Sequence, residues 1–294
     1  MASTEAVITG GLMMPKTAKK LLLYVLMIIV LFVFLGPYVW MFATSVKTQA
    51  DVYAWPPQIL PSEFHWENFV RIWQETNLPR AFFNSVFVST AATAINVFFS
   101  SLAAFAFARL EFPGKNKLFM MVLATMMVPA SLMVVPLFSM MRNVPFAGPN
   151  GWLDSYYGLI FPVAVTGFAI FLMRQYYLTI PKDLDDQAAI DGCNKFQIYW
   201  KIILPLSKPV IGLVVVFTFL NHWNEYLWPL TVARSDEMAT IQIALASFQT
   251  QYNVEWSLLM AGATTAALPM IIFYFILQPL FEESLGGLGR GVKE

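Results

Sequence analysis

Charged side chains are scarce in this sequence: aspartate, glutamate, lysine and arginine make up 12% of its 294 residues, whereas 58% of the residues are hydrophobic. Soluble domains average about 25% charged residues. A packed soluble core could not hide this much apolar surface at this length, so lipid is the expected solvent. The formal net charge is zero, which argues against nucleic acid as a partner.

Cysteine and histidine are also rare. Cys193 is the single cysteine, so the chain can form no internal disulfide. The two histidines, His65 and His222, lie far apart in the sequence, and we expect no metal site. The apolar runs contain no cluster of histidine, cysteine or carboxylate side chains, so no catalytic set can be assembled inside them.

Long apolar runs are abundant instead. A helix that crosses about 30 Å of hydrocarbon needs about 20 mostly apolar residues. The runs that qualify are Leu21–Phe42, Phe82–Phe107, Leu118–Phe138, Tyr157–Met173, Val210–Leu230 and Trp256–Phe281. They predict an all-α membrane protein with six transmembrane helices. The lysines before the first run resemble the start of a signal peptide, but this run is too long for one and no clear cleavage site follows it.

Lysine and arginine are distributed unevenly between the two sides that six spans would create. With the N-terminus inside, thirteen lie on the cytoplasmic side and five lie outside. The positive-inside rule therefore predicts that both termini are cytoplasmic. The inner set is Lys16, Lys19, Lys20, Arg109, Lys115, Lys117, Arg174, Lys182, Lys195, Lys201, Lys208, Arg290 and Lys293; the outer set is Lys47, Arg71, Arg80, Arg142 and Arg234.

The predicted organisation is therefore one membrane domain with short ends. The parts are a cytoplasmic segment 1–20, a transmembrane domain 21–281 that includes a polar loop 181–209, and a cytoplasmic tail 282–294. A long outer connection, Ser45–Arg80, is expected to hold one short amphipathic helix near Trp66–Trp73.

Helix breakers and small residues interrupt several runs. Pro129 and Pro136 lie in the third run, and Pro162 and Gly167 lie in the fourth. A proline inside a helix frees a carbonyl and kinks the rod. Small residues at four-residue spacing let helices approach closely, and ordinary packing is their expected role. These small residues are Ser89, Thr93, Ala104 and Ala108 in the second run, with Gly262 and Ala266 in the sixth.

The polar loop between the fourth and fifth runs reads DDQAAIDGCNKFQIYWKIILPLSKP over Asp185–Pro209. Pro181 suits the start of a helix, and Asp183, Asp185 and Asp186 would lie in its first turns, where the helix dipole favours anions. Gly192 suits the left-handed residue that ends such a helix.

A second short helix is expected to follow Gly192. Phe196, Tyr199, Trp200 and Ile203 recur at helical spacing and predict one apolar face, and Pro205 is expected to end the helix. Two interpretations remain open from composition alone. The loop could be a solvated connection with an interfacial helix, or its three aspartates and aromatic face could dock on a protein partner.

The loop resembles the EAA loop of permease subunits in binding-protein-dependent ABC importers, whose pattern reads Glu-Ala-Ala, then Asp-Gly, then Ile-x-Leu-Pro. Two positions depart from this pattern, an aspartate for the usual glutamate and a glutamine for an alanine. The matching positions are Asp186, Gln187 and Ala188, then Asp191 and Gly192, then Ile202, Leu204 and Pro205. The segments FLNHWNEYLWPL and EWSLLMAGATTAALP, and more loosely GGLGRGVKE, are similar to the carbohydrate-uptake, maltose-type branch of these permeases.

The resemblance implies a multi-subunit importer in a bacterial inner membrane. Its other parts would be a second permease subunit, expected to be a different chain, two ATPase subunits that use ATP and Mg²⁺, and an extracytoplasmic sugar-binding protein. This chain lacks the phosphate-binding loop of such ATPases, because Gly286 and Gly291 have its glycine spacing but Val292 replaces the lysine. We therefore expect it to bind no cofactor and to hydrolyse no ATP. The residues that the resemblance assigns to ATPase coupling are Asp185, Asp186, Gln187, Ala188, Asp191, Gly192, Ile202, Leu204 and Pro205.

A polar cluster, Asn221 to Glu225, interrupts the fifth run. A charge at the bilayer centre costs about 2.5–3.5 kcal/mol, which makes an intramembrane glutamate a candidate for function. Amide and carboxylate groups bind sugar hydroxyls, and tryptophan stacks on a sugar ring. The candidates for a substrate path are Asn221, Trp223, Asn224 and Glu225. Alternatively, the cluster could lie at the outer interface, where Trp223, Tyr226 and Trp228 would form an aromatic belt.

The sequence thus favours the permease subunit of an ATP-driven carbohydrate importer over two other classes. An ion-coupled secondary transporter often shows inverted repeats and several ionisable groups at the midplane; no repeat is visible here and Glu225 is almost the only such group. A membrane-embedded enzyme would need catalytic side chains that the apolar runs lack.

Overall fold

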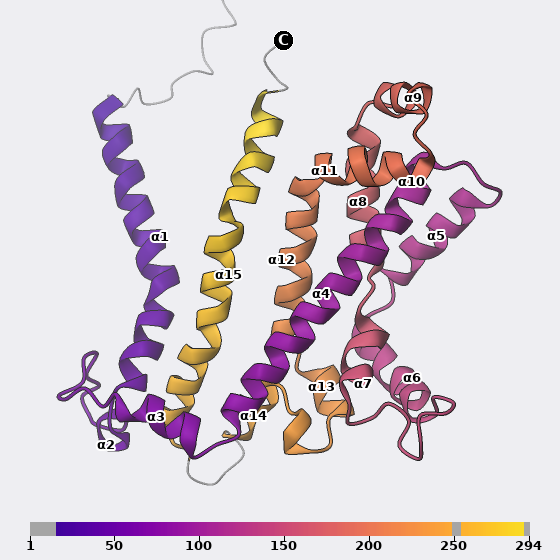
Figure 1. The fold of residues 1–294 in the computed structure, drawn as a ribbon. Coiled ribbons are helices and arrows are strands. Elements are labelled where there is room, and N and C mark those ends of the chain that lie inside the picture. The colour runs from indigo at the N-terminus through magenta and orange to yellow at the C-terminus, as the bar shows by residue number, and fades with distance from the viewer. Residues whose placement is uncertain (1–15, 249–253, 291–294) are drawn as a thin grey trace, which may run out of the picture.

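The computed structural model describes residues 16–248 and 254–290, and within these ranges the chain is helical and contains no strand (Figure 1). In chain order the elements are α1 (Lys16–Ser45), α2 (Gln49–Val52), α3 (Glu67–Gln74), α4 (Leu78–Arg109), α5 (Lys115–Thr125), α6 (Ala130–Arg142), α7 (Tyr156–Ile160), η1 (Phe161–Val163), α8 (Gly167–Thr179), α9 (Asp183–Ile190), α10 (Lys195–Ile198), η2 (Tyr199–Ile203), α11 (Leu204–Leu206), α12 (Lys208–Asn224), α13 (Leu227–Val232), η3 (Asp236–Met238), α14 (Ile241–Ser247) and α15 (Trp256–Arg290). The predicted all-α class is confirmed for these residues.

Helix α4 crosses the middle of the bundle and packs against α8 and α12 (Figure 1). On one flank α1 and α15 lie together, and on the other lie α5 and α6. Helix α1 begins, and α15 ends, at the same end of the bundle as α9, which we call the α9 end; the opposite end carries α3 (Figure 1). Both ends of the described chain therefore share a side with the polar loop.

Small side chains line the buried face of α4. Ser89, Thr93, Ala104 and Ala108 are all buried, as are Gly262 and Ala266 of α15. Their expected role in close packing is confirmed. Close packing matters in lipid, because an apolar side chain gains little free energy when it moves from contact with lipid tails to contact with another helix.

Asn96 joins three of the packed helices from the centre of α4. Its Nδ2 donates to Thr218 Oγ1 of α12 at 2.8 Å and to Thr166 Oγ1, at the start of α8, at 3.3 Å. Its Oδ1 accepts the backbone N–H of Thr166 at 3.1 Å and the hydroxyl of Ser100 at 2.8 Å. The side chain is fully buried, so it satisfies polar groups that lipid could not.

Three described helices are long and apolar enough, by length and composition, to cross a membrane: α1, α4 and α15. The count rises to as many as six if each of three bent helix pairs forms one span. Helix α15 continues to Arg290, well past the predicted end at Phe281.

The third predicted run, Leu118–Phe138, is broken into two helices next to Pro129, one of the two prolines expected to bend it. Helices α5 and α6 meet at an angle of 101°, and the break ends at Pro129, which has a non-helical ψ of 130° and no N–H to continue the helix. The fourth predicted run is likewise bent, by 45° between η1 and α8. Gly167 is the first residue of α8. A Cβ at this position would lie 2.9 Å from Thr125 Oγ1 of α5, so the glycine allows α8 to approach α5 closely.

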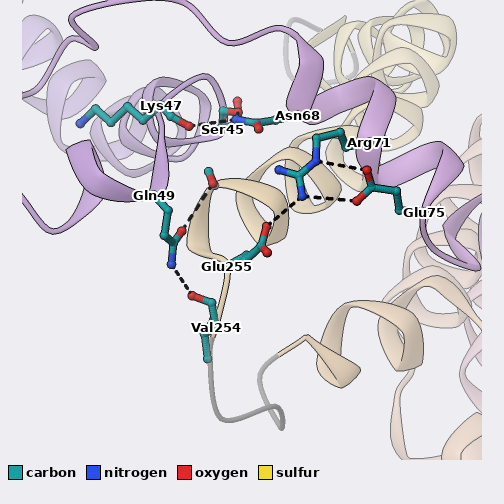
Figure 2. Close-up of polar contacts among 9 residues, drawn as sticks. Ser45, Lys47, Gln49, Asn68, Arg71, Glu75, Val254 and Glu255 are labelled. Carbon is teal, nitrogen blue, oxygen red and sulfur yellow. Dashed lines mark hydrogen bonds and ion pairs between the residues drawn. The ribbon is translucent and has the colours of Figure 1, made fainter.

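The connection between α1 and α4 is folded onto the start of α15. It contains the predicted amphipathic helix, α3, preceded by the single turn of α2. Figure 2 shows Arg71 of α3 between two carboxylates, with its Nη2 3.4 Å from Glu255 Oε2 and its Nε 3.3 Å from Glu75 Oε1. Beside it, Gln49 Nε2 donates to Val254 O at 2.7 Å.

The same connection is held to α1 by a buried amide. Asn68 Nδ2 donates to the backbone carbonyls of Ser45 and Lys47, each at 2.9 Å (Figure 2). These bonds satisfy carbonyls at the C-terminus of α1 that have no partner within the helix. Contacts at the α3 end therefore link α1, α3 and α15 into one unit.

Asn96→Ala is predicted to loosen the helix bundle. Interhelical hydrogen bonds in membrane proteins average about 0.6 kcal/mol, so the loss of the three bonds to Thr166 and Thr218 should lower the free energy of unfolding by about 2 kcal/mol. Thermal unfolding of the purified protein in detergent measures the change. The matched control is Asn143→Ala, because the exposed side chain of Asn143, the residue after α6, donates to Ser139 O of that helix and joins no two helices. Equal unfolding temperatures for the two variants would contradict the prediction.

Candidate functional site

Helix α9 starts and ends as its sequence predicts. It begins two residues after Pro181 and has Asp183, Asp185 and Asp186 in its first turn, where carboxylates oppose the positive end of the helix dipole. Gly192 has a φ of +85°. The N–H of Gly192 donates to Ala189 O at 3.1 Å and that of Cys193 donates to Ala188 O at 2.9 Å, the pair of bonds that defines a Schellman motif.

The aspartates of α9 face in different directions. Asp185 lies against the body of the protein, where its Oδ2 is 3.2 Å from Arg109 Nε at the C-terminus of α4. Arg109 Nη2 also donates to Ile180 O at 2.7 Å. Asp183 and Asp186 are exposed. The idea that all three carboxylates are available to a partner is therefore wrong for Asp185, which anchors α9 to its own chain.

The ion pair between Arg109 and Asp185 is mostly buried, with 3% and 12% of the two side chains exposed. Arg109 Nη1 and Asp185 Oδ1 find no hydrogen-bond partner among the described residues. Burial removes water from both charges, and each charge then depends on the other for compensation. Removal of either charge would leave the other buried without a counterion.

The second helix of the loop starts with a capping box. Asn194 Oδ1 accepts the N–H of Gln197 at 2.9 Å, while the N–H of Asn194 donates to Gln197 Oε1 at 2.8 Å. These reciprocal bonds satisfy two N–H groups at the helix start. They fix the direction in which the chain leaves the Gly192 turn.

Pro205 does not end this helix, contrary to the prediction. The chain continues helically through α10, η2 and α11 to Leu206 and turns by 76° into α12. The η2 segment is a π-helix in which Leu204 N donates to Tyr199 O. The wider turn accommodates a proline, which lacks an N–H and would clash with the carbonyl four residues earlier in a regular α-helix.

The predicted apolar face of this helix is divided between two surfaces. Tyr199 and Ile203 are buried against α4 and α8, and the Tyr199 hydroxyl lies 2.7 Å from Ser101 Oγ of α4. Phe196 and Trp200 remain 66% and 53% exposed, with their rings nearly parallel and 6.5 Å apart. One pair fixes the helix, and the other pair faces outward.

The coupling residues assigned from the sequence thus separate into anchoring and exposed groups. Asp185 and Ala188 are buried, and Ile202 and Leu204 are partly buried against the same core cluster. The exposed members are Asp186, Gln187, Asp191, Gly192 and Pro205. Ile190, at 85% exposed, adds an apolar side chain to this exposed surface. Ile190 was not assigned to coupling from the sequence, and its position next to Asp191 was the only indication that it belongs to this surface.

The polar cluster of the fifth run lies at the other end of α12. Helix α12 ends at Asn224 rather than at the predicted Leu230, because Glu225 has extended backbone and its Oε1 accepts the N–H groups of Leu227 and Trp228 at 3.0 and 3.2 Å. Glu225 therefore caps α13. A helix of 17 residues is about 25 Å long, so the loop and this cluster are separate sites.

The remaining residues of the cluster differ in exposure. Trp223 is 1% exposed, stacks on Phe219 and donates its Nε1–H to Ala266 O at 3.2 Å, so no sugar ring can reach its face in this arrangement. Trp228 is buried as well, which leaves Tyr226 as the exposed aromatic residue of the predicted belt. Asn221 and Asn224 are exposed.

Comparison with known proteins identifies the family. Residues 96–286 match the family described as "Binding-protein-dependent transport system inner membrane component". The chain belongs to this family. The matched range of this inner membrane component includes the polar loop and the α12 cluster, and the membership confirms the resemblance that the loop sequence indicated.

Curated relatives of this inner membrane component are named as permease proteins of transport systems. The arabinooligosaccharides transport system permease protein AraQ of Bacillus subtilis (strain 168) is 40% identical over 204 residues, which cover 69% of this chain and 70% of the relative. The lactose transport system permease protein LacG of Rhizobium radiobacter is 28% identical over 256 residues, with 87% and 91% covered.

Solved structures share the fold of this inner membrane component. A bacterial ABC transporter involved in the import of the acidic polysaccharide alginate contains a chain with a TM-score of 0.80 at 23% identity, covering 91% of this chain and 99% of that one. A structure of the bacterial alginate ABC transporter in complex with an alginate pentasaccharide-bound periplasmic protein gives a TM-score of 0.63 at 16% identity, covering 88% and 93%.

The two adjacent aspartates give a matched test of the anchor. Asp185→Asn is predicted to destabilise the seating of α9 by about 3 kcal/mol, because it leaves Arg109 charged and buried without a counterion. Hydrogen exchange of residues 181–193 should increase accordingly. Asp186→Asn, one residue away on the exposed side, should leave this exchange near that of the parent protein. Equal exchange in the two variants would show that the ion pair does not anchor the loop.

Proposed function

We propose that this inner membrane component is the permease subunit of an ATP-driven carbohydrate importer, with α9 and the exposed face of α10 as the coupling element that a separate ATPase subunit binds. Family membership supports the importer class. The single observation that carries the coupling assignment is the exposed surface of Asp186, Gln187 and Ile190 on a helix whose other face is pinned to α4.

A sugar is the proposed solute class. The relatives include permeases named for arabinooligosaccharides and lactose, and the fold is that of a chain from an alginate importer. A further relative, UgpE of Yersinia pestis, is named for sn-glycerol-3-phosphate. The shared chemistry is a polyhydroxylated solute, which suits the exposed amides of Asn221 and Asn224.

The membrane orientation follows from the charges and the helix ends. The α9 end carries Arg109, Arg174 and the lysines of the loop, and α1 starts and α15 ends there (Figure 1). The positive-inside rule then places the α9 end in the cytoplasm. The α5–α6 pair and the α7–α8 pair would each form one span and α12 another, so that the chain crosses the inner membrane six times, and the α3 end faces the binding protein outside.

Coupling would work through the rigid attachment of the loop. ATP and Mg²⁺ are used by two partner ATPase subunits, whose closure would move α9 and α10. The ion pair at Arg109 and the hydroxyl contact of Tyr199 with Ser101 would pass this movement to α4. A second permease subunit, expected to be a different chain, would complete the pathway, and this chain would supply no catalytic group.

Asp186→Lys is predicted to uncouple ATP hydrolysis from uptake. The exposed Asp186 side chain contributes to the fold only through the helix dipole, whereas charge reversal at a partner contact should lower uptake by at least about tenfold. Gly192→Pro should act similarly, because a φ of +85° is closed to proline. Uptake and ATPase activity of the reconstituted complex are the readouts. Asp186→Glu, which restores the usual carboxylate, is the control and should transport normally; uptake by Asp186→Lys equal to that of the parent would overturn the assignment.

Asn221 and Asn224 are proposed to contact the solute at the α3 end of α12. Replacement of either by alanine removes one hydrogen bond of about 1 kcal/mol and should raise the KM for uptake about fivefold, with ATPase activity in the absence of solute unchanged. Asn143→Ala, another exposed asparagine, serves as the control. Unchanged KM in both α12 variants would assign the cluster to structure alone.

A further inference from the structure

A polar hollow of about 490 Å³ lies at the α9 end, beside the turn that joins α4 to α5. Its lining includes Lys115, Asn116 and Lys117 from the first turn of α5, and Arg174 from α8. Glu111 is the one acidic residue of the lining, so three cations face a single carboxylate. We call this hollow the α4–α5 pocket.

Arg174 is held in a fixed position within the α4–α5 pocket. Its Nε donates to Phe107 O at 3.3 Å, and its guanidinium carbon lies 4.0 Å from the centroid of the Phe119 ring. Its two Nη nitrogens make no hydrogen bond to another described residue. A guanidinium fixed in this way can offer paired N–H groups, the geometry that suits phosphate oxygens.

The carboxylate does not close the α4–α5 pocket. Glu111 lies 3.1 Å from Lys115 Nζ, but 85% of its side chain is exposed, against 15% for Lys115. Glu111 belongs to the turn before α5, and water around its exposed carboxylate weakens its attraction for Lys115. Lys115 can therefore exchange this partner for an anion inside the pocket at little cost, while exposed Lys117 adds a second mobile cation.

The surroundings of the α4–α5 pocket are apolar. Leu118, Met120 and Met121 follow the lysines on α5 and are exposed by 47%, 69% and 64%. Helix α5 lies on the flank of the bundle away from α1 and α15 (Figure 1). Cations at the cytoplasmic boundary followed by exposed apolar side chains match the two parts of a phospholipid, a charged headgroup and its acyl chains.

We propose that the α4–α5 pocket binds the phosphate-bearing headgroup of an anionic phospholipid from the cytoplasmic leaflet, with the acyl chains along α5. The proposal rests on the orientation given under the proposed function. Arg174 would bind the phosphate through its Nη groups, and Lys115 and Lys117 would add charge. Basic pockets at the cytoplasmic ends of transmembrane helices are suited to such headgroups, and each lysine or arginine near an anionic surface adds about 1 kcal/mol.

The experiment uses the assembled importer in nanodiscs of phosphatidylcholine that contain a small fraction of spin-labelled phosphatidylglycerol. The expected result is an immobilised spectral component that exceeds the one given by spin-labelled phosphatidylcholine. Lys117→Gln should lower the affinity about fivefold, and Lys117→Gln with Arg174→Gln about 25-fold. Lys117→Gln alone changes an exposed side chain, so we expect this variant to fold like the parent protein. Arg174→Lys, which keeps the charge but loses the planar fork, should give an intermediate loss.

The matched control removes two exposed cations from the same end of the bundle, by Lys19→Gln with Lys20→Gln at the start of α1, and should leave the immobilised component unchanged. Equal losses in this control would overturn the proposal, as would the absence of a phosphatidylglycerol preference in the parent. Displacement by inorganic phosphate would mean an anion site rather than a lipid site. Loss of the ATPase subunits from the Lys117 variant with unchanged lipid binding would mean a protein contact.

The measurement needs neither ATP nor solute, and so a failure of the coupling assignment leaves it standing. A phosphatidylglycerol preference in a complex whose Asp186→Lys variant transports normally would refute coupling through α9 alone. Conversely, uncoupling by Asp186→Lys without any lipid preference would refute only the lipid site.

Discussion

The contact between Arg109 and Asp185 decides how the polar loop can act. Arg109 ends the long central helix α4, and Asp185 belongs to the first turn of α9. Because both side chains are mostly buried, each charge needs the other, and separation would cost far more than an exposed ion pair does. The loop therefore does not move freely on the bundle. Any displacement of α9 must also displace the end of α4.

A second attachment lies on the other side of the Gly192 turn. Tyr199 of η2 contacts Ser101, two turns before the end of α4, and Ile203 is buried in the same core cluster. Both halves of the loop are thus fixed to one helix, and the Schellman motif and capping box between them fix the turn. Such a unit transmits force as a rigid body. Flexibility would have to come from the bends outside it, such as the junction of 76° that precedes α12.

The sequence predicted the helices well where a single local signal decided the outcome. Pro181 and Gly192 bound α9, and the small residues of α4 mark its packed face. It failed where the backbone had a choice of conformations. Pro205 could have ended the helix, but a π-turn accommodates it, and hydropathy does not distinguish a straight run from the right-angled break before Pro129. Hydropathy is averaged over many residues, whereas a bend depends on which single backbone carbonyl lacks a hydrogen-bonding N–H.

The candidate site shows the same limit more sharply. Motif spacing identified Asp186 and Gly192, but it grouped Asp185 with them, because adjacent positions on a helix look alike in a pattern. Only the position of Arg109, 76 residues earlier in the chain, separates an anchoring aspartate from an exposed one. Trp223 was grouped with its polar neighbours for the same reason, although its side chain is buried and its indole N–H donates to Ala266 O of α15.

The distribution of polar groups explains why the chain can hold these two sites apart. Inside the bundle, Asn96 and its partners satisfy one another, so they stabilise packing and leave nothing for a solute. Exposed polar groups are found mainly at the two ends, with α9 and Lys117 at one and Asn221 and Asn224 near the other. Since α4 runs from one end to the other and carries no charged side chain between Arg80 and Arg109, a force on α9 would reach the α3 end by movement of the helix rather than through a relay of protons or charges. This arrangement fits transport driven by a partner that pulls on the loop, and it gives an ion gradient no buried charge along α4 between Arg80 and Arg109 on which to act.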